Sequence, residues 1–529
     1  MDQIATHVST FLFIGLLVFS PTMVVHGATG SLCSQTPYPK LCSSFMVSDK
    51  LDTETTSFIV HRDYALSATM AQALQAHRLI SDMDTSSYQE RAKSAWADCL
   101  EHYEDSISQL NRSMSITNPN KDNNDVQTWL SSALTNHQTC EDGFADFNLS
   151  STYLNSFPLN NFTKFLGNSL AINKAIMAPQ TSGLSSGNPK GRHLLAHDLP
   201  EWISISDRKL LQATAPKPDL VVAQDGSGNY RTISQAVAAA RTGTKRFVIY
   251  VKRGVYKENV EIKKSMKNLM LVGDGIDATV VTASKSNADG STTFRSATFA
   301  ASGDGLIVRG MTFENTAGPQ SHQAVAVRSG SDLSVFYGCS FKGYQDTLYV
   351  YSQRQFYRNC DIYGTVDFIF GNAAAIMQNC NIYVRKPMSN QFNTVTAQGR
   401  TDPNQNTGIV LHNCRVTAAS DLKAVQGAFK TYLGRPWKQY SRTVVIKSFL
   451  DGLIDSTGWL PWSGSFALKT LYYGEFMNTG NGAGTGGRVK WPGYHVITGV
   501  QEAGRFSVGS FLNGNSWLAA TGVPFTSGL

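Results

Sequence analysis

The chain has 529 residues, of which 42% are hydrophobic and 16% are charged. This length exceeds what one hydrophobic core usually fills and predicts two domains, and the composition excludes a disordered chain. The net charge of +7 is unevenly distributed: residues 1–211 hold 14 Lys and Arg against 20 Asp and Glu, a net −6, whereas residues 212–529 hold 32 against 19, a net +13. The basic part indicates a polyanionic partner, which is nucleic acid, anionic lipid or an acidic polysaccharide.

The N-terminal segment, residues 1–28, has the pattern of a secretory signal peptide. Residues 11–19 are apolar, and the small residues Gly27 and Ala28 follow. The apolar run is too short for a comfortable membrane span, but the segment before it contains Asp2 and no Lys or Arg. An uncleaved anchor is therefore the alternative. In both cases the rest of the chain enters an oxidising compartment.

Sequons and cysteines agree with secretion. The predicted N-glycosylation sites are Asn111, Asn148 and Asn161. The chain has eight cysteines and no C-x-x-C pair of the kind that binds metals, so the cysteines are predicted to form disulfides.

Residues 29–180 are predicted to form an all-α bundle, because apolar residues recur three and four positions apart. Cys33 and Cys42 are nine residues apart and are expected to close a local hairpin, while Cys99 and Cys140 lie on separate helical segments that a disulfide would join. This pairing is one of three possible for four cysteines.

Residues 181–211 are predicted to be a linker that is cut by a protease of the secretory pathway. The segment 181–192 is rich in Gly, Ser and Pro, and two strings that pair basic residues with Leu-Leu follow it. The second string contains Arg208 and Lys209, which form the predicted processing site.

Residues 212–529 contain a repeated phrase, which predicts a right-handed parallel β-helix. The phrase appears at 334–341, 354–363, 375–383 and 410–416, each time as a short alternating strand followed by a turn signal. The aligned residues Phe341, Ile362 and Ile382 are 21 and 20 positions apart. One strand per repeat at this period is typical of a β-solenoid rather than a sandwich or barrel.

The last four cysteines occupy the same position in their repeats. Neighbouring coils of a solenoid stack about 4.8 Å apart, which is within reach of a disulfide. The simplest predicted pairing is Cys339–Cys360 with Cys380–Cys414, and a Cys360–Cys380 bond is the alternative.

The same period brings polar side chains together on one face. Gln323 and Gln345 are 22 residues apart, and Asp346 and Asp367 are 21 apart, so they are predicted to lie on three successive coils. Two carboxylates about 5 Å apart do not both ionise easily, so one site obtains an acid and a base or nucleophile at one pH.

A second motif, Leu433-Gly434-Arg435-Pro436-Trp437, lies further along. Arg435 is suited to brace a carboxylate through a fork of hydrogen bonds, and Trp437 offers a flat surface for a sugar ring. The sequence shows no Ser or Cys nucleophile in a recognisable elbow and no metal-ligand spacing, so no metal or other cofactor is expected.

Five strings in order across about 300 residues resemble the signature set of plant pectin methylesterases: GVYKE at 254–258, QAV at 323–325, QDTL at 345–348, DFIFG at 367–371 and LGRPW at 433–437. The four N-terminal cysteines and the strings at 95–107 and 129–144 resemble the pectin methylesterase inhibitor domain. The whole chain therefore resembles a precursor with an inhibitory pro-region.

This resemblance implies a mechanism for hydrolysing methyl esters of galacturonate. Asp367 would be the nucleophile and Asp346 the acid and then the base, while Gln345 and Gln323 would donate hydrogen bonds to the oxyanion. Arg435 would hold Asp367 ionised and oriented. The residues expected to line the sugar cleft are Tyr349, Phe370, Trp437 and Trp459, together with Gln323 and Arg435.

Spacing alone does not select this reaction. A carboxylate pair about 5 Å apart also suits a retaining glycosidase, so a chain-cleaving pectinase is the second hypothesis. A non-catalytic binder of cell-wall polysaccharide is the third, favoured by the basic charge. The expected partners are methyl-esterified homogalacturonan, the chain's own N-terminal domain or a separate inhibitor protein, and a processing protease. We expect no nucleic-acid partner, a monomeric mature protein and secretion into the plant cell wall.

Overall fold

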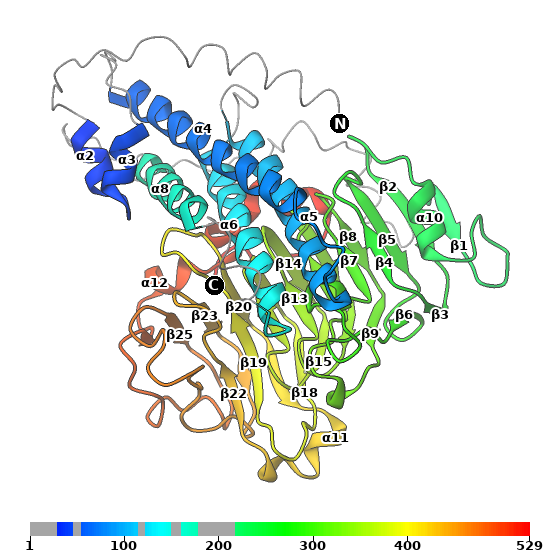
Figure 1. Cartoon of the computed structure of the whole chain (residues 1–529). Coiled ribbons are helices and arrows are strands. Elements are labelled where there is room, and N and C mark those ends of the chain that lie inside the picture. The colour runs from blue at the N-terminus through cyan, green and yellow to red at the C-terminus, as the bar shows by residue number, and fades with distance from the viewer. Residues whose placement is uncertain (1–28, 46–53, 115–121, 150–159, 178–216) are drawn as a thin grey trace, which may run out of the picture.

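The computed structural model describes residues 29–45, 54–114, 122–149, 160–177 and 217–529. The predicted signal segment, the linker and the processing site at Arg208 and Lys209 lie outside the described residues. Within them, the chain forms a helical domain before residue 178 and a β-helix domain after residue 216 (Figure 1). No helix in these ranges is both long enough and apolar enough to cross a membrane.

The helical domain is the bundle that the sequence predicts. Its helices are α2 (Thr29–Ser34), α3 (Pro39–Phe45), α4 (Glu54–Ser81), α5 (Glu90–Ser113), α6 (Asn123–Ala145) and α8 (Asn160–Met177). In α5, Ala95, Cys99, Tyr103 and Leu110 are buried, which is the three-and-four spacing of one helix face. The side chain of Asp122 caps α6 by accepting from the backbone N–H of Asn124.

Two disulfides join the helices as expected: Cys33–Cys42 links α2 to α3, and Cys99–Cys140 links α5 to α6. The predicted glycosylation sites Asn111, Asn148 and Asn161 are all exposed on this domain. Glycosylation of these sites stays a prediction.

The β-helix domain contains three sheets, here called A, B and C, in which every strand pairing is parallel. Sheet A consists of β1 (Leu220–Val222), β2 (Phe247–Val251), β5 (Leu269–Gly273), β8 (Ile307–Arg309), β11 (Ser334–Tyr337), β14 (Arg354–Arg358), β17 (Ala374–Gln378), β20 (Gly408–His412), β23 (Arg442–Ile446), β25 (Tyr472–Phe476) and β26 (Tyr494–Val496). Sheet B consists of β3 (Gly254–Lys257), β6 (Thr279–Ala283), β9 (Thr312–Asn315), β12 (Ser340–Lys342), β15 (Asp361–Gly364), β18 (Asn381–Val384), β21 (Arg415–Ala418) and β24 (Phe449–Leu450). Sheet C consists of β4 (Val260–Ile262), β7 (Phe299–Ala301), β10 (Val327–Ser329), β13 (Leu348–Val350), β16 (Ile369–Gly371), β19 (Asn393–Gln398) and β22 (Thr431–Gly434).

Short helices complete the domain. They are α10 (Ile233–Ala239), α11 (Ser420–Lys423), α12 (Val500–Gly504) and α13 (Val508–Phe511).

The register confirms the repeat. Phe341 pairs with Ile362, and Ile362 pairs with Ile382, so the aligned residues stack on successive coils. The interior column is aromatic and aliphatic: the rings of Phe336 and Tyr357 stack with centroids 5.0 Å apart. Burying a side chain of this size stabilises the fold by about 2–3 kcal/mol. The parallel β-helix is therefore held together by repeated burial of the same sequence phrase.

The predicted disulfides of the β-helix domain were wrong. Cys339, Cys360, Cys380 and Cys414 are buried free thiols. Each thiol donates to a backbone carbonyl of the preceding coil; the distance is 3.5 Å from Cys339 to Val308 and 3.2 Å from Cys414 to Met377. The four thiols stack along the coils and contact their neighbours without forming a covalent bond.

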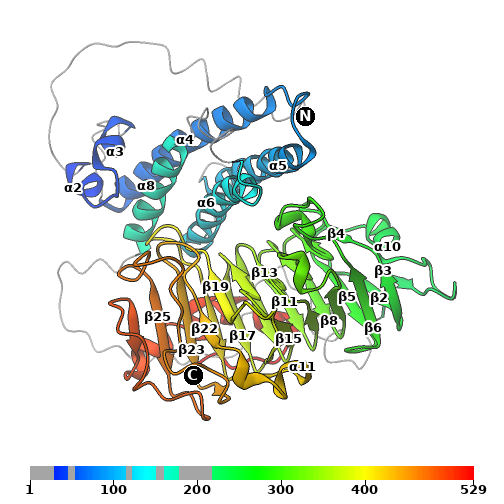
Figure 2. The same ribbon diagram turned by 60° about the horizontal axis from the view of Figure 1, so that its bottom comes forward.

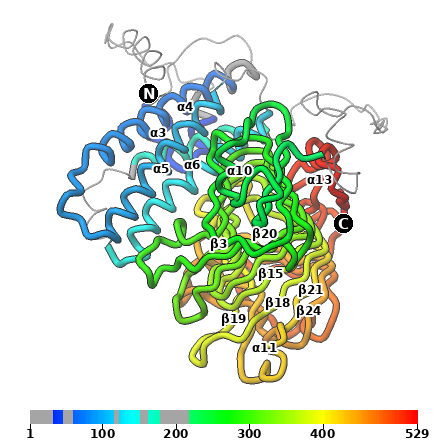
Figure 3. The backbone as a smooth tube through the Cα atoms, turned by 90° about the vertical axis from the view of Figure 1, so that its right-hand side faces the viewer, coloured from blue at the N-terminus to red at the C-terminus, as the bar shows by residue number. Residues whose placement is uncertain are grey.

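The helical domain lies along one side of the β-helix. Figures 2 and 3 show α4, α5 and α6 together beside the stacked coils, and hydrogen bonds join α5 and α6 to the loops at both edges of sheet C. Each domain has its own hydrophobic core, and among the residues that the structure describes no core cluster mixes the two domains. The two domains are therefore separately packed units that meet over sheet C.

Candidate active site

The outward face of sheet C carries a cluster of aromatic side chains. Tyr349 on β13 and Phe370 on β16 are neighbours in register, and their rings stack with centroids 4.2 Å apart. Trp437 meets the edge of Phe370 at 5.9 Å. Aromatic faces of this kind are suited to hold the apolar face of a sugar ring.

Asp367 lies in the turn two residues before β16 and is only 5% exposed. Arg435 donates to both carboxylate oxygens, from Nε to Oδ1 at 2.8 Å and from Nη2 to Oδ2 at 2.6 Å. The hydroxyl of Thr394 on β19 donates to Oδ1 at 2.6 Å and accepts from the Asp367 backbone N–H at 2.8 Å. These bonds fix the orientation of the carboxylate.

The position of Arg435 depends on a close approach of strands β19 and β22. Gly434 ends β22 and pairs with Thr396 on β19. A Cβ at position 434 would lie 2.1 Å from the Thr396 hydroxyl oxygen, so only glycine fits. The LGRPW motif therefore uses Gly434 to bring β22 against β19 and Arg435 against Asp367.

Asp346 precedes β13 as Asp367 precedes β16, and the pairing of Leu348 with Ile369 places the two Asp at equivalent positions of adjacent coils. Asp346 is 7% exposed. Burial raises the pKa of Asp346 well above its ordinary value, and the neighbouring charges of Asp367 and Asp146 raise it further. Asp346 therefore retains a proton at pH values where an ordinary aspartate has lost it.

Both carboxylates occupy left-handed backbone conformations, with φ of 63° at Asp346 and 52° at Asp367. This conformation costs a non-glycine residue about 1–2 kcal/mol, although aspartate tolerates it better than most. Two such residues at equivalent places on adjacent coils indicate that the turns before β13 and β16 are built to present these side chains.

The predicted site residues meet in a cavity of about 350 Å³. The sequence-predicted residues in its lining are Gln323, Gln345, Asp346, Tyr349, Asp367, Phe370, Arg435 and Trp437. The lining also contains Thr292, Thr293, Phe294, Ala397 and Trp462 of the β-helix domain, and Thr139, Asp142, Gly143, Ala145 and Asp146 of the helical domain. The described residues contain no group of three or more His, Cys, Asp or Glu that could hold a metal ion.

Trp459 does not belong to this lining, which corrects the sequence prediction. It is 1% exposed, packs against Tyr473 with centroids 4.2 Å apart, and donates its indole N–H to Glu475 at 3.2 Å. Trp462, three residues later, takes its place: it is 38% exposed, and the Arg435 guanidinium lies 4.3 Å from its ring centroid.

The helical domain closes the cavity at the edge where the strands of sheet C begin, here called the catalytic edge. Lys438, which follows the end of β22 and extends over the cavity, pairs with Asp142 of α6 at 2.5 Å. Asp146, just after α6, accepts from both the backbone N–H and the hydroxyl of Thr293, at 2.9 and 2.8 Å. Burial raises the pKa of Asp142 above its ordinary value and that of Asp146 to about 6.

Helix α5 contributes a second set of contacts to the catalytic edge. Asp98 accepts from the hydroxyl of Thr292 at 2.5 Å and pairs with Arg295. Glu101 pairs with the same Arg295 at 2.9 Å. Burial raises the pKa of Asp98 to about 6, although Arg295 and Thr292 act in the opposite direction.

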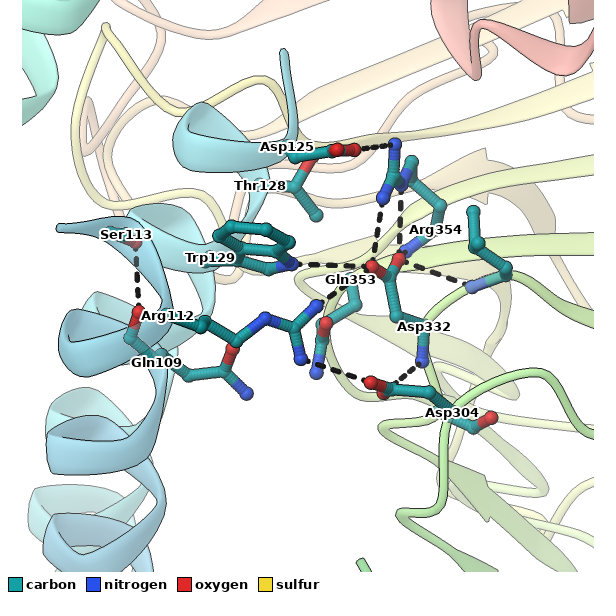
Figure 4. A network of polar contacts seen from close by, with 12 residues as sticks. Gln109, Arg112, Ser113, Asp125, Thr128, Trp129, Asp304, Asp332, Gln353 and Arg354 are labelled. Carbon is teal, nitrogen blue, oxygen red and sulfur yellow. Dashed lines mark hydrogen bonds and ion pairs between the residues drawn. The ribbon is translucent and has the colours of Figure 1, made fainter. Parts of the chain in front are cut away.

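At the opposite edge of sheet C, where the strands end, Arg112 of α5 bridges two carboxylates (Figure 4). It pairs with Asp304 at 3.0 Å and with Asp332 at 3.2 Å. Its guanidinium also lies 4.0 Å from the ring centroid of Trp129, whose indole N–H donates to Asp332 at 3.4 Å. Arg354 of β14 holds both oxygens of Asp332, at 3.0 and 2.8 Å.

This anchor has electrostatics opposite to those of the catalytic edge. Burial acts to raise the pKa of Asp332, but Arg354 and Arg112 outweigh it, and the pKa falls to about 2. Arg354 also reaches the helical domain, because its Nη1 pairs with Asp125 of α6 at 2.7 Å. We call the group Arg112, Asp125, Asp304, Asp332 and Arg354 the anchor.

Sequence reasoning missed the anchor, Thr394 and Trp462. Thr394 lies in a strand with no motif of its own, and the polar residues of α5 and α6 have the pattern of solvated helix faces. The WLPW string at 459–462 was the only signal for Trp462.

Comparison with known proteins agrees with this geometry. Residues 219–515 match the pectinesterase family, and residues 28–172 match the plant invertase/pectin methylesterase inhibitor family. "Pectinesterase 2" of Citrus sinensis is 54% identical over 94% of both chains, and "Probable pectinesterase/pectinesterase inhibitor 6" of Arabidopsis thaliana is 54% identical over 94% of this chain and 93% of its own.

Solved structures match the β-helix domain. The pectin methylesterase from carrot is 59% identical and aligns over 60% of this chain and all of its own, with a TM-score of 0.59. A pectin methylesterase from Aspergillus niger is 30% identical over 58% of this chain and 97% of its own, with a TM-score of 0.51. The chain belongs to the pectinesterase family and carries an N-terminal domain of the pectin methylesterase inhibitor family.

Proposed function

We propose that the β-helix domain hydrolyses the methyl esters of cell-wall homogalacturonan to pectate and methanol, with Asp367 as nucleophile and Asp346 as acid and base. The pairing of a braced carboxylate with a protonated one carries this proposal. Asp367 is held by Arg435 and Thr394, whereas burial and then the neighbouring charge of Asp367, which belongs to the same domain, raise the pKa of Asp346. One site thus offers an oriented nucleophile beside a carboxyl group that holds a proton.

The first step forms an acyl-enzyme. A carboxylate oxygen of Asp367 attacks the ester carbonyl, and Asp346 gives its proton to the departing methoxide, which leaves as methanol. Gln345 and Gln323, both in the cavity lining, donate amide hydrogens to the developing oxyanion, where one donor contributes about 3 kcal/mol.

The second step regenerates the site. Asp346, now ionised, removes a proton from water, and the resulting hydroxide attacks the acyl carbonyl and releases Asp367. Arg435 keeps the carboxylate of Asp367 in one orientation throughout. Tyr349, Phe370 and Trp437 hold the sugar ring over the reacting ester.

One assay separates this proposal from the other two candidate functions. The β-helix domain is incubated with methylated pectin, and methanol, new reducing ends and binding are measured. We expect methanol without new reducing ends. New reducing ends would identify a chain-cleaving glycosidase, and binding without either product would identify a non-catalytic binder.

We further propose that the helical domain inhibits the enzyme until the chain is cut within residues 181–211. Thr139, Asp142 and Asp146 of the helical domain line the catalytic cavity together with Asp346 and Asp367. A polysaccharide cannot occupy the same space. We propose that a protease cuts the chain at Arg208 and Lys209 during secretion. The separated enzyme then acts as a monomer in the cell wall.

The test compares the intact chain with the β-helix domain obtained by cutting the linker and removing the helical domain. We expect the intact chain to release methanol at least about 100-fold more slowly, since its helical domain must dissociate from the cavity before substrate binds. Equal rates for the two forms would reject inhibition, whereas no methanol release by either form would reject the esterase proposal.

A further inference from the structure

Arg328 lies on the outward face of sheet C beside the catalytic cavity. It is on β10, where it pairs in register with Tyr349 of β13 on one side and with Ala300 of β7 on the other. Tyr349 lines the cavity and stacks on Phe370, so Arg328 is one strand away from the aromatic floor of the site. Its position makes it part of the surface that a bound polysaccharide would cross.

The guanidinium of Arg328 lacks the partner that its neighbours have. The side chain is 5% exposed, and its Nε and Nη1 are buried without any hydrogen-bond partner. Its guanidinium lies 3.4 Å from the ring centroid of Phe294. A buried guanidinium whose Nε and Nη1 have no acceptor is costly to the protein, so a position of this kind indicates a binding function.

The other cations beside the cavity each bind a carboxylate in the closed chain. Arg295 holds Asp98 and Glu101 of the helical domain, and Lys438 holds Asp142. These carboxylates occupy the face of sheet C that the substrate needs. They mark places where the β-helix domain accepts carboxylates.

At Arg328 the described part of the helical domain places no carboxylate within ion-pair distance, although the charges of Glu101 and Asp98, both bound to Arg295, act on the guanidinium from farther away. The group that packs beside it is neutral. His102 of α5 meets the ring of Phe294 with centroids 4.4 Å apart and lies 3.3 Å from the hydroxyl of Tyr351. Burial, with Arg328 and Arg295, holds the pKa of His102 well below its ordinary value, so the imidazole is uncharged. The helical domain therefore covers Arg328 but leaves its hydrogen-bonding capacity unused.

We propose that Arg328, once uncovered, binds the free carboxylate of an already de-esterified galacturonate unit next to the methyl ester being hydrolysed. The inference rests on the proposed esterase function. A guanidinium fits a carboxylate through two parallel hydrogen bonds and does not gain the same bonds from a methyl ester, which has lost its charge. The product carboxylate of one turnover then helps to bind the chain for the next.

The test uses two oligogalacturonides of equal length, one fully methyl-esterified and one with a single free carboxylate, and the β-helix domain with Arg328→Gln. In Arg328→Gln, we expect kcat/KM for the substrate with one free carboxylate to fall about tenfold, the size of one charged hydrogen-bonded contact, because KM rises. For the fully esterified substrate, kcat/KM should change by less than about twofold. Arg309→Gln, on β8 of sheet A, removes the same charge away from the cavity and should change neither value.

A second measurement does not depend on catalysis. Fully de-esterified oligogalacturonate should bind the Arg328→Gln domain about tenfold more weakly than the unchanged domain, with Arg328→Lys between the two because it keeps the charge and loses the fork. Equal loss of kcat/KM for both substrates, or unchanged binding of oligogalacturonate, would overturn the role of Arg328. If the unchanged domain released no methanol, the esterase proposal would be rejected, and the binding measurement would still test whether Arg328 binds a carboxylate.

Thermal unfolding shows whether Arg328→Gln folds. If it does not, Arg328→Lys provides the test, through a loss of kcat/KM for the substrate with one free carboxylate only.

Discussion

The two edges of sheet C hold the helical domain with carboxylates of opposite character. At the catalytic edge, burial dominates: the pKa of Asp98 and of Asp146 rises to about 6. At the opposite edge, the cations dominate: Arg354 and Arg112 lower the pKa of Asp332 to about 2. The first edge covers the reacting groups, and the second contacts none of them.

This difference in pKa gives the two edges different pH dependences for holding the helical domain. A carboxylate whose pKa is raised on docking favours the docked state at low pH, and this contribution is lost as pH rises through about 6. At the anchor, only the share of the lowered pKa of Asp332 that comes from Arg112 depends on docking, because Arg354 belongs to the β-helix domain itself. That share is present above the ordinary pKa of the carboxylate and is lost only as pH falls toward about 2. Between pH 4 and 6 the catalytic edge therefore weakens while the anchor keeps its strength.

The largest expected effect separates chemistry from docking. Asp367→Asn should lower kcat by about 10³-fold or more, because an amide is not a nucleophile. Methanol release by the separated β-helix domain measures this. Docking should persist, since Arg112, Lys438 and Arg295 make their contacts elsewhere.

A matched control is Asp361→Asn, the same change on β15 of sheet B, which should leave kcat within about twofold. Thermal unfolding shows whether both variants keep the fold. Near-normal turnover in Asp367→Asn would remove Asp367 from the role of nucleophile.

The second prediction breaks the anchor. Arg112→Gln removes the ion pairs with Asp304 and Asp332 across the interface, which should weaken docking by about 2–3 kcal/mol. The intact chain should then release methanol about 30- to 100-fold faster than the unchanged chain, because the open fraction rises.

Lys93→Gln, on the same helix but paired with Glu90 of that helix, is the control and should change the rate less than twofold. If both variants behaved alike, the anchor would not hold the helical domain.

The coils and the catalytic face could be predicted from the sequence, because a solenoid turns sequence period into spatial stacking. The 21-residue spacing of Asp346 and Asp367 became the observed register. The state of Cys339 and its equivalents could not be predicted, because a period fixes which residues stack but not where their sulfur atoms point. Trp459 and Trp462 are three residues apart, and only the tertiary fold decides which one is buried.

The contacts between the two domains could not be predicted from the sequence for a related reason. Asp98 and Arg112 occur on amphipathic helices whose polar faces look solvated in the sequence. Only the docking of that face on sheet C shows that Asp98 binds Arg295 and that Arg112 binds Asp304.

The third prediction concerns pH at the catalytic edge. Raising the pH from about 4 to about 6 should weaken docking by at least about tenfold, since a carboxylate whose pKa is raised by about two units on docking contributes up to about 2.7 kcal/mol at low pH and loses most of it by pH 6. Asp146→Asn cannot ionise and should remove part of this dependence. The inhibition of the β-helix domain by the separated helical domain, measured across this pH range, provides the readout.

Arg112→Gln serves as the comparison for pH. It should weaken inhibition at every pH by the same factor, because Asp332 does not titrate in this range. A pH dependence that was unchanged in Asp146→Asn and lost in Arg112→Gln would reverse the assignment of the two edges.

The smallest expected effect lies within the catalytic edge and tests the positioning of Asp367. Thr394→Val keeps the shape of a buried side chain but removes the hydroxyl that bonds both the carboxylate and the backbone N–H of Asp367. Because Arg435 still holds both carboxylate oxygens, kcat should fall only about tenfold, with KM within about twofold. Thr394→Ser restores the hydroxyl and should restore most of the rate.

Thr443→Val is the matched control, since Thr443 is also buried in a strand but its hydroxyl has no partner. Equal losses in Thr394→Val and Thr394→Ser would show that Thr394 only fills space, and the orientation of Asp367 would then rest on Arg435 alone.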